Sequence, residues 1–269
     1  MSSPSLPPRL LSIAGSDSGG GAGIQADLKA FARCGAHGMT AITAVTAQNT
    51  TGVSGIYALP PAAIVEQVRA VAADIGVDAV KVGMLGTTET IEAVARALDL
   101  LPGVPVVLDP VMVAESGAAL LDDGARQALR ARLVPRAAVV TPNLAEAAVL
   151  AGSGAHTPAD ELARAVHRLG PGAVVVTGGH RDEAADLFFD GDRLVEIPGP
   201  RHPDGASHGS GCTHSSALAA HLALGFEPLA AARAARQIAA EAVGAGLRGI
   251  GSGAGPVDAL AIAERREQP

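Results

Sequence analysis

The chain has 269 residues, of which 48% are hydrophobic and only 2% aromatic, and its formal net charge at pH 7 is −7. This length and apolar fraction are sufficient for a sizeable core without disulfides or structural metals. The negative charge argues against a nucleic-acid-binding protein. The two cysteines, Cys34 and Cys212, are too few for a disulfide framework or a cysteine-rich zinc site. We find no secretory signal pattern and no apolar run of about 18 residues, so we expect a cytoplasmic protein that neither spans nor binds a membrane.

Apolar runs alternate with helical patterns along most of the chain. The first helical pattern, from Ile24 to Gly35, is followed by one that opens at Pro60-Pro61 and continues through Ile64, Val68 and Val71. Further along, Thr157 is expected to cap a helix that contains Leu162 and Val166. The apolar runs between these patterns predict buried strands at 10–15, 39–45, 79–85, 104–110, 137–143 and 172–179.

The pattern changes after residue 184. Two short apolar runs flank Asp190-Gly191, which predicts a β-hairpin over 184–197. Two alanine-rich helices are expected near 212–224 and 227–244, and the glycine-rich segment 246–256 is interpreted as a connection to a short last helix. Repeated strand–helix units predict an α/β fold with three αβα layers and a mostly parallel central sheet, with the hairpin at its edge. We expect residues 1–269 to form one domain.

Small, polar and acidic residues follow each predicted strand, where ligands bind in open α/β sheets. Any one of these segments could be an ordinary turn, because glycine, proline and aspartate are common turn residues. Their recurrence at every strand end instead predicts a ligand site. The segments are Gly15-Ser16-Asp17, Gln48-Asn49, Gly83-Met84, Asp109-Pro110-Val111, Thr141-Pro142-Asn143 and Thr177-Gly178-Gly179.

The first of these loops, GSDSGGGAG at 15–23, is rich in glycine. Residues 21–26 match the pattern G-x-G-x-x-A, but the following AITAVTAQN segment lacks the acidic residue that dinucleotide-binding folds place there. The sequence therefore does not predict nicotinamide binding. Instead, the glycines would let the backbone approach a flat or phosphorylated ligand closely.

The stretch HGSGCTHSSA at 208–217 places one of the two cysteines directly after Gly-Ser-Gly at a predicted helix start. Free backbone N–H groups and the helix dipole make such a start an anion site. The thiol of Cys212 is therefore expected to have a lowered pKa. It could serve as the nucleophile of a hydrolase or as a general base beside a phosphoryl group, and a small buried cysteine is the structural alternative.

Several motifs, taken in order, carry a resemblance to a known family. They are IAGSDSGGGAGIQADLKAF (13–31), TAQNT (46–50), KVGML (81–85), LDPVM (108–112), TPNLAEA (141–147), GGH (178–180) and HGSGCTHSSALAA (208–220). This arrangement resembles the ribokinase-like superfamily, and within it most closely the hydroxymethylpyrimidine/phosphomethylpyrimidine kinases. The resemblance implies a ribokinase-like αβα fold. It also implies ATP-dependent phosphorylation of 4-amino-5-hydroxymethyl-2-methylpyrimidine, and then of its monophosphate, in thiamine biosynthesis.

The resemblance also implies roles for individual residues. Cys212 would be the catalytic base, and the amides of Gly209, Ser210 and Gly211 would hold the transferring phosphoryl group. The nucleotide would be ATP with Mg²⁺, a potassium ion is a further candidate, and the assembly would be a homodimer. The implied substrate-binding residues are Gln48, Asp27, Gly15, Met84 and Val111; those for ATP are Asn143, Thr177 and Gly179; and those for the metal are Glu146 and Asp109.

Three alternatives stay open. A pyridoxal/pyridoxine kinase would share every motif, because both substrates are flat six-membered rings with a hydroxymethyl group. Thr177 stands where the family usually has a lysine, which suggests a catalytically silent pyrimidine-binding protein. A cysteine hydrolase would need a histidine base within reach of Cys212.

Overall fold

The computed structural model describes residues 6–114, 117, 120–154, 156–178, 185–202 and 205–265. Within these residues the main sheet has eight strands in the order β10-β9-β8-β7-β6-β5-β1-β2. All neighbours from β2 to β8 run parallel, whereas β9 and β10 add an antiparallel hairpin at one edge. The strands are β1 (Arg9–Ala14), β2 (His37–Ile42), β5 (Ala79–Val82), β6 (Val106–Leu108), β7 (Val139–Val140), β8 (Ala173–Val176), β9 (Asp186–Phe189) and β10 (Leu194–Ile197).

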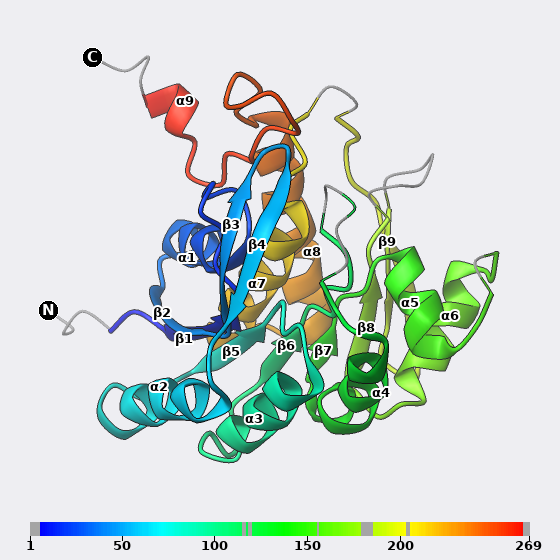
Figure 1. The fold of residues 1–269 in the computed structure, drawn as a ribbon. Coiled ribbons are helices and arrows are strands. Elements are labelled where there is room, and N and C mark those ends of the chain that lie inside the picture. The colour runs from blue at the N-terminus through cyan, green and yellow to red at the C-terminus, as the bar shows by residue number, and fades with distance from the viewer. Residues whose placement is uncertain are drawn as a thin grey trace, which may run out of the picture.

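Helices cover both faces of this sheet, as Figure 1 shows. One face packs against α2 (Pro61–Asp74), α3 (Thr88–Leu98), α4 (Asp123–Arg132), α5 (Leu144–Ala151) and α6 (Ala159–His167). The other packs against α1 (Gly23–Arg33), α7 (Ser210–Ala223) and α8 (Pro228–Gly244). A short 3₁₀ helix, η1 (Val134–Arg136), follows α4, and α9 (Ile262–Arg265) comes last. The predicted three-layer αβα class is therefore confirmed.

The core follows the two-residue period of the strands. In β1, Leu11 and Ile13 belong to the cluster under α2 to α6, whereas Leu10 belongs to the cluster under α1, α7 and α8. Aliphatic residues fill both clusters, and Phe31 and Phe188 are the fully buried aromatic side chains among the largest described core residues. A sheet buried on both faces explains why its strands appear in the sequence as nearly continuous apolar runs.

The predicted hairpin over 184–197 is also confirmed, although residue 184 lies outside the described residues. Its turn contains Gly191 at a φ of 101°, a left-handed conformation that favours glycine. The side chain of Asp190 accepts hydrogen bonds from the backbone of Asp192 (3.2 Å) and Arg193 (2.7 Å). These bonds hold the turn that the Asp-Gly pair predicted.

The predicted strand over 39–45 is wrong at its end. The main-sheet strand β2 stops at Ile42, and the chain continues as a separate hairpin of β3 (Ala44–Asn49) and β4 (Gly52–Ala58). Thr43 lies at the break: its N–H donates to the Ala14 carbonyl (3.0 Å), and its hydroxyl donates to the Met84 carbonyl (2.8 Å). Gln48 and Asn49 therefore lie on this hairpin and not at the end of a main-sheet strand.

Two helical predictions also need correction. The sequence analysis did not anticipate α4, whose polar sequence DGARQALRAR contributes the buried residues Ala125 and Leu129 to the core. Thr157 does not cap α6: Pro158 is the N-cap, and the Thr157 hydroxyl donates to the Gly154 carbonyl (2.9 Å). Proline suits this position because its fixed φ is compatible with a helix start.

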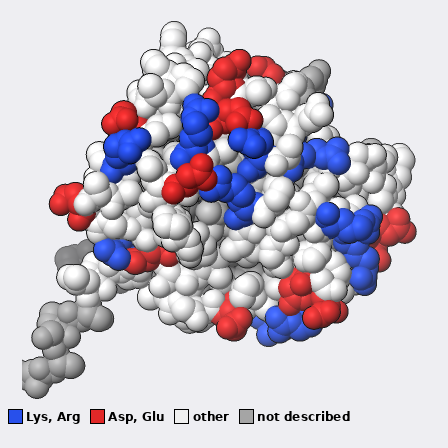
Figure 2. Space-filling model, turned by 90° about the horizontal axis from the view of Figure 1, so that it is seen from below, with Lys and Arg blue, Asp and Glu red and all other residues white. Residues whose placement is uncertain are grey.

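One face of the molecule carries mixed charge. Figure 2 shows acidic and basic side chains close to one another on the face seen from below. On this face, such mixing limits a field of a single sign. Within the described part of the chain, no helix has the length and apolarity that a membrane crossing requires.

The strand order determines where a ligand site can form. From β1 the chain first goes to its neighbour β2, and it later returns to the opposite side of β1 as β5. The connection after β1 leads to β2 on one side, and the connection after β5 leads to β6 on the other. This divergence opens a crevice at the carboxyl ends of β1 and β5. Helix α7 packs against β1, β5 and β6, so its N-terminus lies at the same place.

Candidate active site

A cleft of about 470 Å³ lies at this crevice. Every residue to which the resemblance gave a role lines it, with two exceptions. Asp27 lies behind the cleft, and Gly179 lies outside the described residues. The predicted residues that line it are Gly15, Gln48, Met84, Asp109, Val111, Asn143, Glu146, Thr177, Gly209, Ser210, Gly211 and Cys212. The structure thus brings together segments from both ends of the chain.

The anion loop, residues 208–212, begins helix α7. Its N-cap residue Gly209 has a φ of 88°, and a side chain there would collide with the Gly21 carbonyl oxygen. Glycine is therefore required both by the backbone conformation and by the close approach of the first loop. The Ser210 amide donates to the Ser207 carbonyl (3.0 Å), whereas the amides of Gly211 and Cys212 belong to a first helical turn that supplies no carbonyl partners.

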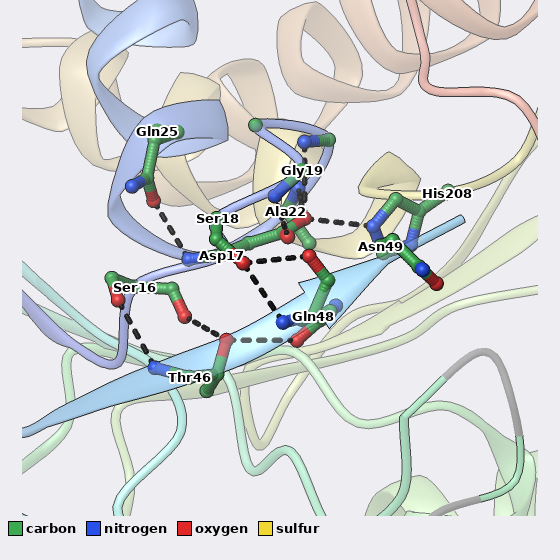
Figure 3. A network of polar contacts seen from close by, with 12 residues as sticks. Ser16, Asp17, Ser18, Gly19, Ala22, Gln25, Thr46, Gln48, Asn49 and His208 are labelled. Atoms are coloured by element: carbon green, nitrogen blue, oxygen red, sulfur yellow. Dashed lines mark hydrogen bonds and ion pairs between the residues drawn. The ribbon is translucent and has the colours of Figure 1, made fainter. Parts of the chain in front are cut away.

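A buried carboxylate joins the first loop to the anion loop (Figure 3). Asp17 is 1% exposed and accepts hydrogen bonds from the amides of Gly19 (2.8 Å), Gly21 (3.0 Å) and Ala22 (2.8 Å). Its Oδ2 also lies 2.8 Å from Nε2 of His208. Burial raises the pKa of Asp17, but the His208 contact and the amides outweigh burial and hold the pKa below its usual range. The charged carboxylate therefore fixes both loops in one arrangement.

The β3–β4 hairpin is attached to the same first loop, as Figure 3 also shows. The Thr46 hydroxyl donates to the Ser16 carbonyl (2.8 Å), and the Ser18 hydroxyl both donates to the Gln48 carbonyl (2.6 Å) and accepts from the Gln48 amide (2.8 Å). The Gln48 side-chain oxygen accepts from the Thr46 hydroxyl (3.3 Å). These bonds bring Gln48 to the cleft although it lies outside the main sheet.

Lys81, which the sequence analysis did not identify, lies at the base of the cleft. It is fully buried in β5, with Nζ 2.8 Å from Oδ1 of Asp27 and 4.0 Å from Oδ2 of Asp109. Asp27 also accepts from the hydroxyls of Ser12 (2.5 Å) and Ser216 (2.8 Å). Burial lowers the pKa of Lys81, but the charge of Asp27 and the neighbouring acidic groups raise it above its usual range. A lone lysine within the apolar strand AVKV was the signal that could have identified it.

Asp109 and Glu146 form the acidic side of the cleft. Glu146 and Asn143 make a capping box: each side chain accepts from the other's amide at 2.9 Å. Burial, and then the charge of Asp109, raise the pKa of Glu146 to about 8. Burial likewise raises the pKa of Asp109, although Lys81 and the Ser215 hydroxyl (3.0 Å) oppose it. The negative charge of Asp109 and that of Glu146 repel each other. A cation bound between them would stabilise both carboxylates as anions.

The donor set of this acidic side fits magnesium. Mg²⁺ prefers oxygen ligands and usually takes one or two carboxylates, completing its shell with water and substrate phosphates. Across the described ranges, no group of three or more His, Cys, Asp or Glu is arranged to hold a metal ion.

The expected lowering of the Cys212 pKa is wrong. Burial raises the pKa of the thiol to about 12, and the charges of Asp27 and Asp109 add to the rise. Lys81 and the Gly23 amide oppose it without reversing it. The helix N-terminus is present, but desolvation of the thiolate outweighs its effect. At neutral pH the thiol is therefore protonated and is not a preformed nucleophile.

Comparisons with known proteins agree with this geometry. The model of a family described as phosphomethylpyrimidine kinase matches residues 17–258. The hydroxymethylpyrimidine/phosphomethylpyrimidine kinase of Rhizobium meliloti is 50% identical over 253 residues, which cover 92% of this chain and 95% of the relative.

Solved structures show the same architecture. A pyridoxal kinase of Bacillus subtilis, solved as an ADP complex, has a TM-score of 0.87 and 36% identity, covering 96% of this chain and 99% of the other. A phosphomethylpyrimidine kinase of Clostridium difficile has a TM-score of 0.75 and 39% identity, with coverage of 85% and 96%. Fold and site together define an ATP-dependent kinase with a ribokinase-like fold. The chain belongs to the phosphomethylpyrimidine kinase family, which confirms the resemblance seen in the sequence.

The raised pKa of Glu146 has a measurable effect on stability. In the unfolded chain a glutamate has a pKa of roughly 4.3, so between that value and about 8 only the folded chain retains the proton. Folding stability should therefore fall as pH rises through this window. Thermal unfolding in metal-free buffer from pH 5 to 9 should show a shallower decline for Glu146→Gln than for the unaltered chain. Glu66→Gln, on the exposed face of α2, is the control. Equal slopes for Glu146→Gln and the unaltered chain would contradict the assignment.

The raised pKa of Cys212 should make its alkylation slow. The thiolate is the reactive form, and a pKa of about 12 leaves little of it at pH 8. Relative to an ordinary cysteine thiol, the thiolate fraction is lower by about 10³-fold. We expect iodoacetamide to modify Cys212 correspondingly slowly in a Cys34→Ala background, as followed by mass spectrometry of the intact protein. A rate like that of a free thiol would show that the thiol is not desolvated.

Proposed function

We propose that the chain transfers the γ-phosphoryl group of ATP to 4-amino-5-hydroxymethyl-2-methylpyrimidine and then to its monophosphate, in thiamine biosynthesis. The main support for this proposal is that one cleft contains both a side-chain amide and a helix N-terminus. A side-chain amide, Gln48, is bound to the glycine-rich first loop. A helix N-terminus, at Gly209–Cys212, lies across from it in the same cleft. One feature suits a flat nitrogen ring and the other a phosphoryl group.

The ring would lie among Gln48, Gly15, Met84 and Val111, which share the cleft. An amide side chain offers both a donor and an acceptor, the combination that an aminopyrimidine edge requires. At Gly15 a side chain would come within 3.2 Å of the Met84 sulfur, so glycine keeps the space beside Met84 open. Asp27 does not line the cleft; we propose that it acts through Lys81, which does.

The nucleotide would lie along Asn143 and Thr177, with Gly179 a prediction outside the described residues. Glu146 and Asp109 would hold Mg²⁺, which when bound supplies charge neutralisation for the phosphate oxygens. The family's usual lysine at position 177 is replaced by threonine, so cationic side chains elsewhere must contribute to holding the phosphates. The potassium requirement and the homodimer stay predictions from the resemblance.

The transfer itself requires positioning and charge stabilisation more than covalent chemistry. The amides of Gly211 and Cys212, together with the dipole of α7, would stabilise charge that develops on the transferring group. Cys212 would first lose its own proton to solvent and would then, as a thiolate, accept the proton of the attacking hydroxyl. Burial is the largest cause of the raised pKa of Cys212 and the charges of Asp27 and Asp109 add to it, so a cation that neutralises Asp109 would favour the thiolate.

A second candidate function is supported by a specific observation. The similarity in structure to the Bacillus subtilis pyridoxal kinase, at a TM-score of 0.87, exceeds that to the Clostridium difficile phosphomethylpyrimidine kinase, at 0.75. Sequence identity favours the pyrimidine kinase, because the Rhizobium meliloti relative is 50% identical to this chain. Pyridoxal phosphorylation is therefore kept as the alternative.

An ADP-release assay with an acceptor panel tests the proposal. The hydroxymethyl pyrimidine, its monophosphate, pyridoxal and pyridoxine are each supplied with MgATP. We expect kcat/KM for the two pyrimidines to exceed that for both vitamin B6 forms, because the cleft recognises an amino-substituted ring through Gln48. Turnover of pyridoxal alone would establish the alternative. Ligand binding without ADP release from any acceptor would indicate a silent binding protein.

Replacement of Cys212 tests its role as base. Cys212→Ala should lower kcat by roughly 10²–10⁴, the usual range for general acid–base catalysis. Binding of pyrimidine and MgATP should persist, because the loop amides and the cleft walls remain. Cys212→Asp, which supplies a carboxylate base, should recover part of the rate, and Cys34→Ala serves as the matched control. Near-full kcat in Cys212→Ala would show that the thiol only packs.

A further inference from the structure

A buried histidine–carboxylate pair lies in the cleft and has no role in the function proposed above. His214 of α7 is 4% exposed and Asp186 of β9 is 1% exposed. Nε2 of His214 lies 3.2 Å from Oδ2 of Asp186, close enough for an ion pair. Within the described residues, Nδ1 of His214 makes no hydrogen bond. A buried polar atom without a partner is costly, so the presence of this nitrogen in a ligand cleft points to a ligand.

The pair lies on the nucleotide side of the cleft. Oδ1 of Asp186 accepts from the Gly178 amide (2.9 Å), so the pair is adjacent to Thr177. His214 follows Ser210 by four residues in α7, which places both on one face of the helix, one turn apart. Thr177, Ser210, Asp186 and His214 all line the same cleft. The pair therefore lies between the anion loop and the end of β8.

Charged groups on three elements face His214. Asp186 approaches it from β9, and Asp109 from the end of β6. Arg236 of α8 also lines the cleft, with Nε 4.0 Å from Oδ1 of Asp186. Burial raises the pKa of Asp186, but His214, the Gly178 amide and Arg236 outweigh burial and hold it below its usual range. Asp186 is therefore an anion with cationic or protonatable side chains around it.

The buried ammonium of Lys81, which also lines the cleft, is already paired with carboxylates. The Lys81 ammonium donates to Asp27 and lies near Asp109, so its charge balances two carboxylates. Thr177 brings no charge. Phosphates bound beside Ser210 would therefore draw on Mg²⁺ and on other groups that line the cleft, among them His214 and the N-terminus of α7.

We propose that His214, oriented by Asp186 and accompanied by Arg236, binds the phosphate groups of the nucleotide through a ring N–H group. This proposal rests on the proposed ATP-dependent function. It assigns to a helix residue part of the phosphate binding that a lysine at position 177 would provide. A phosphate oxygen is a charged acceptor, so such a hydrogen bond is stronger than one between neutral groups. The acceptor ring, which meets Gln48 and Met84, would not depend on it.

Calorimetric titration with adenosine, ADP and ATP in the presence of Mg²⁺, without acceptor, tests the proposal on the full chain. His214→Leu should weaken ADP and ATP binding by roughly 10- to 100-fold, the value of one or two hydrogen bonds to a charged group. Adenosine affinity should not change. His214→Lys should keep most of the affinity for ADP and ATP, and His214→Gln should lie between Lys and Leu. In turnover, KM for ATP should rise while KM for the acceptor does not.

His221→Leu, on the same helix but outside the cleft, is the matched control. If His214→Leu does not fold, Asp186→Asn and His214→Gln carry the test, with the same selective loss for ADP and ATP expected. Equal weakening of adenosine and ATP, or unchanged ATP binding in His214→Leu, would overturn the proposal. An unaltered chain that binds no nucleotide would instead overturn the proposed function, and this inference with it.

Discussion

The buried ammonium of Lys81 is the interaction on which the rest of the site depends. A lysine in the interior of a parallel sheet is strongly disfavoured unless carboxylates compensate its charge, because removing a single ion from water costs several kcal/mol. Asp27 and Asp109 provide that compensation at 2.8 and 4.0 Å. Each carboxylate is held in turn by a serine of α7, Ser216 and Ser215 respectively. One charge thus links α1, α7 and the ends of β5 and β6.

This compensation also determines the chemistry of neighbouring groups. Asp109 remains close to Glu146 and contributes to the pKa of about 8 of that side chain. The same two carboxylates contribute to the pKa of about 12 of Cys212. The cleft without ligands is therefore rich in acids and holds its thiol protonated. A site of this kind favours the binding of a cation, because its positive charge relieves the repulsion among the buried acids. The bound cation would in turn attract a polyphosphate.

A second set of contacts fixes the loops above this charge. Asp17 accepts hydrogen bonds from three amides of the first loop and contacts the ring of His208. Gly209 packs against the Gly21 carbonyl, which is possible only because Gly209 lacks a side chain. The β3–β4 hairpin joins the same loop through Ser18 and Thr46. In the proposed function, recognition of a ring and recognition of a phosphoryl group would therefore be mechanically connected, although Gln48 and Ser210 are far apart in the sequence. A kinase that works mainly by positioning benefits from such a connection.

The sequence by itself determined the layered fold, because continuous aliphatic runs separated by helical patterns are compatible only with a sheet covered on both faces. It also predicted the cleft at the strand ends and the helix start at the anion loop, both of which follow from local rules. The roles assigned to individual cleft residues remain predictions. Tertiary structure alone decided the departure of the chain from β2 at Thr43, the place of Gln48 on a separate hairpin, and the partners of Lys81. It also reversed the expected pKa of Cys212, because burial and the charges of Asp27 and Asp109 depend on contacts between segments as far apart as 189 residues, such as Ser216 with Asp27. A pattern of neighbouring residues cannot specify such contacts, since desolvation and long-range charge exist only once the chain has folded.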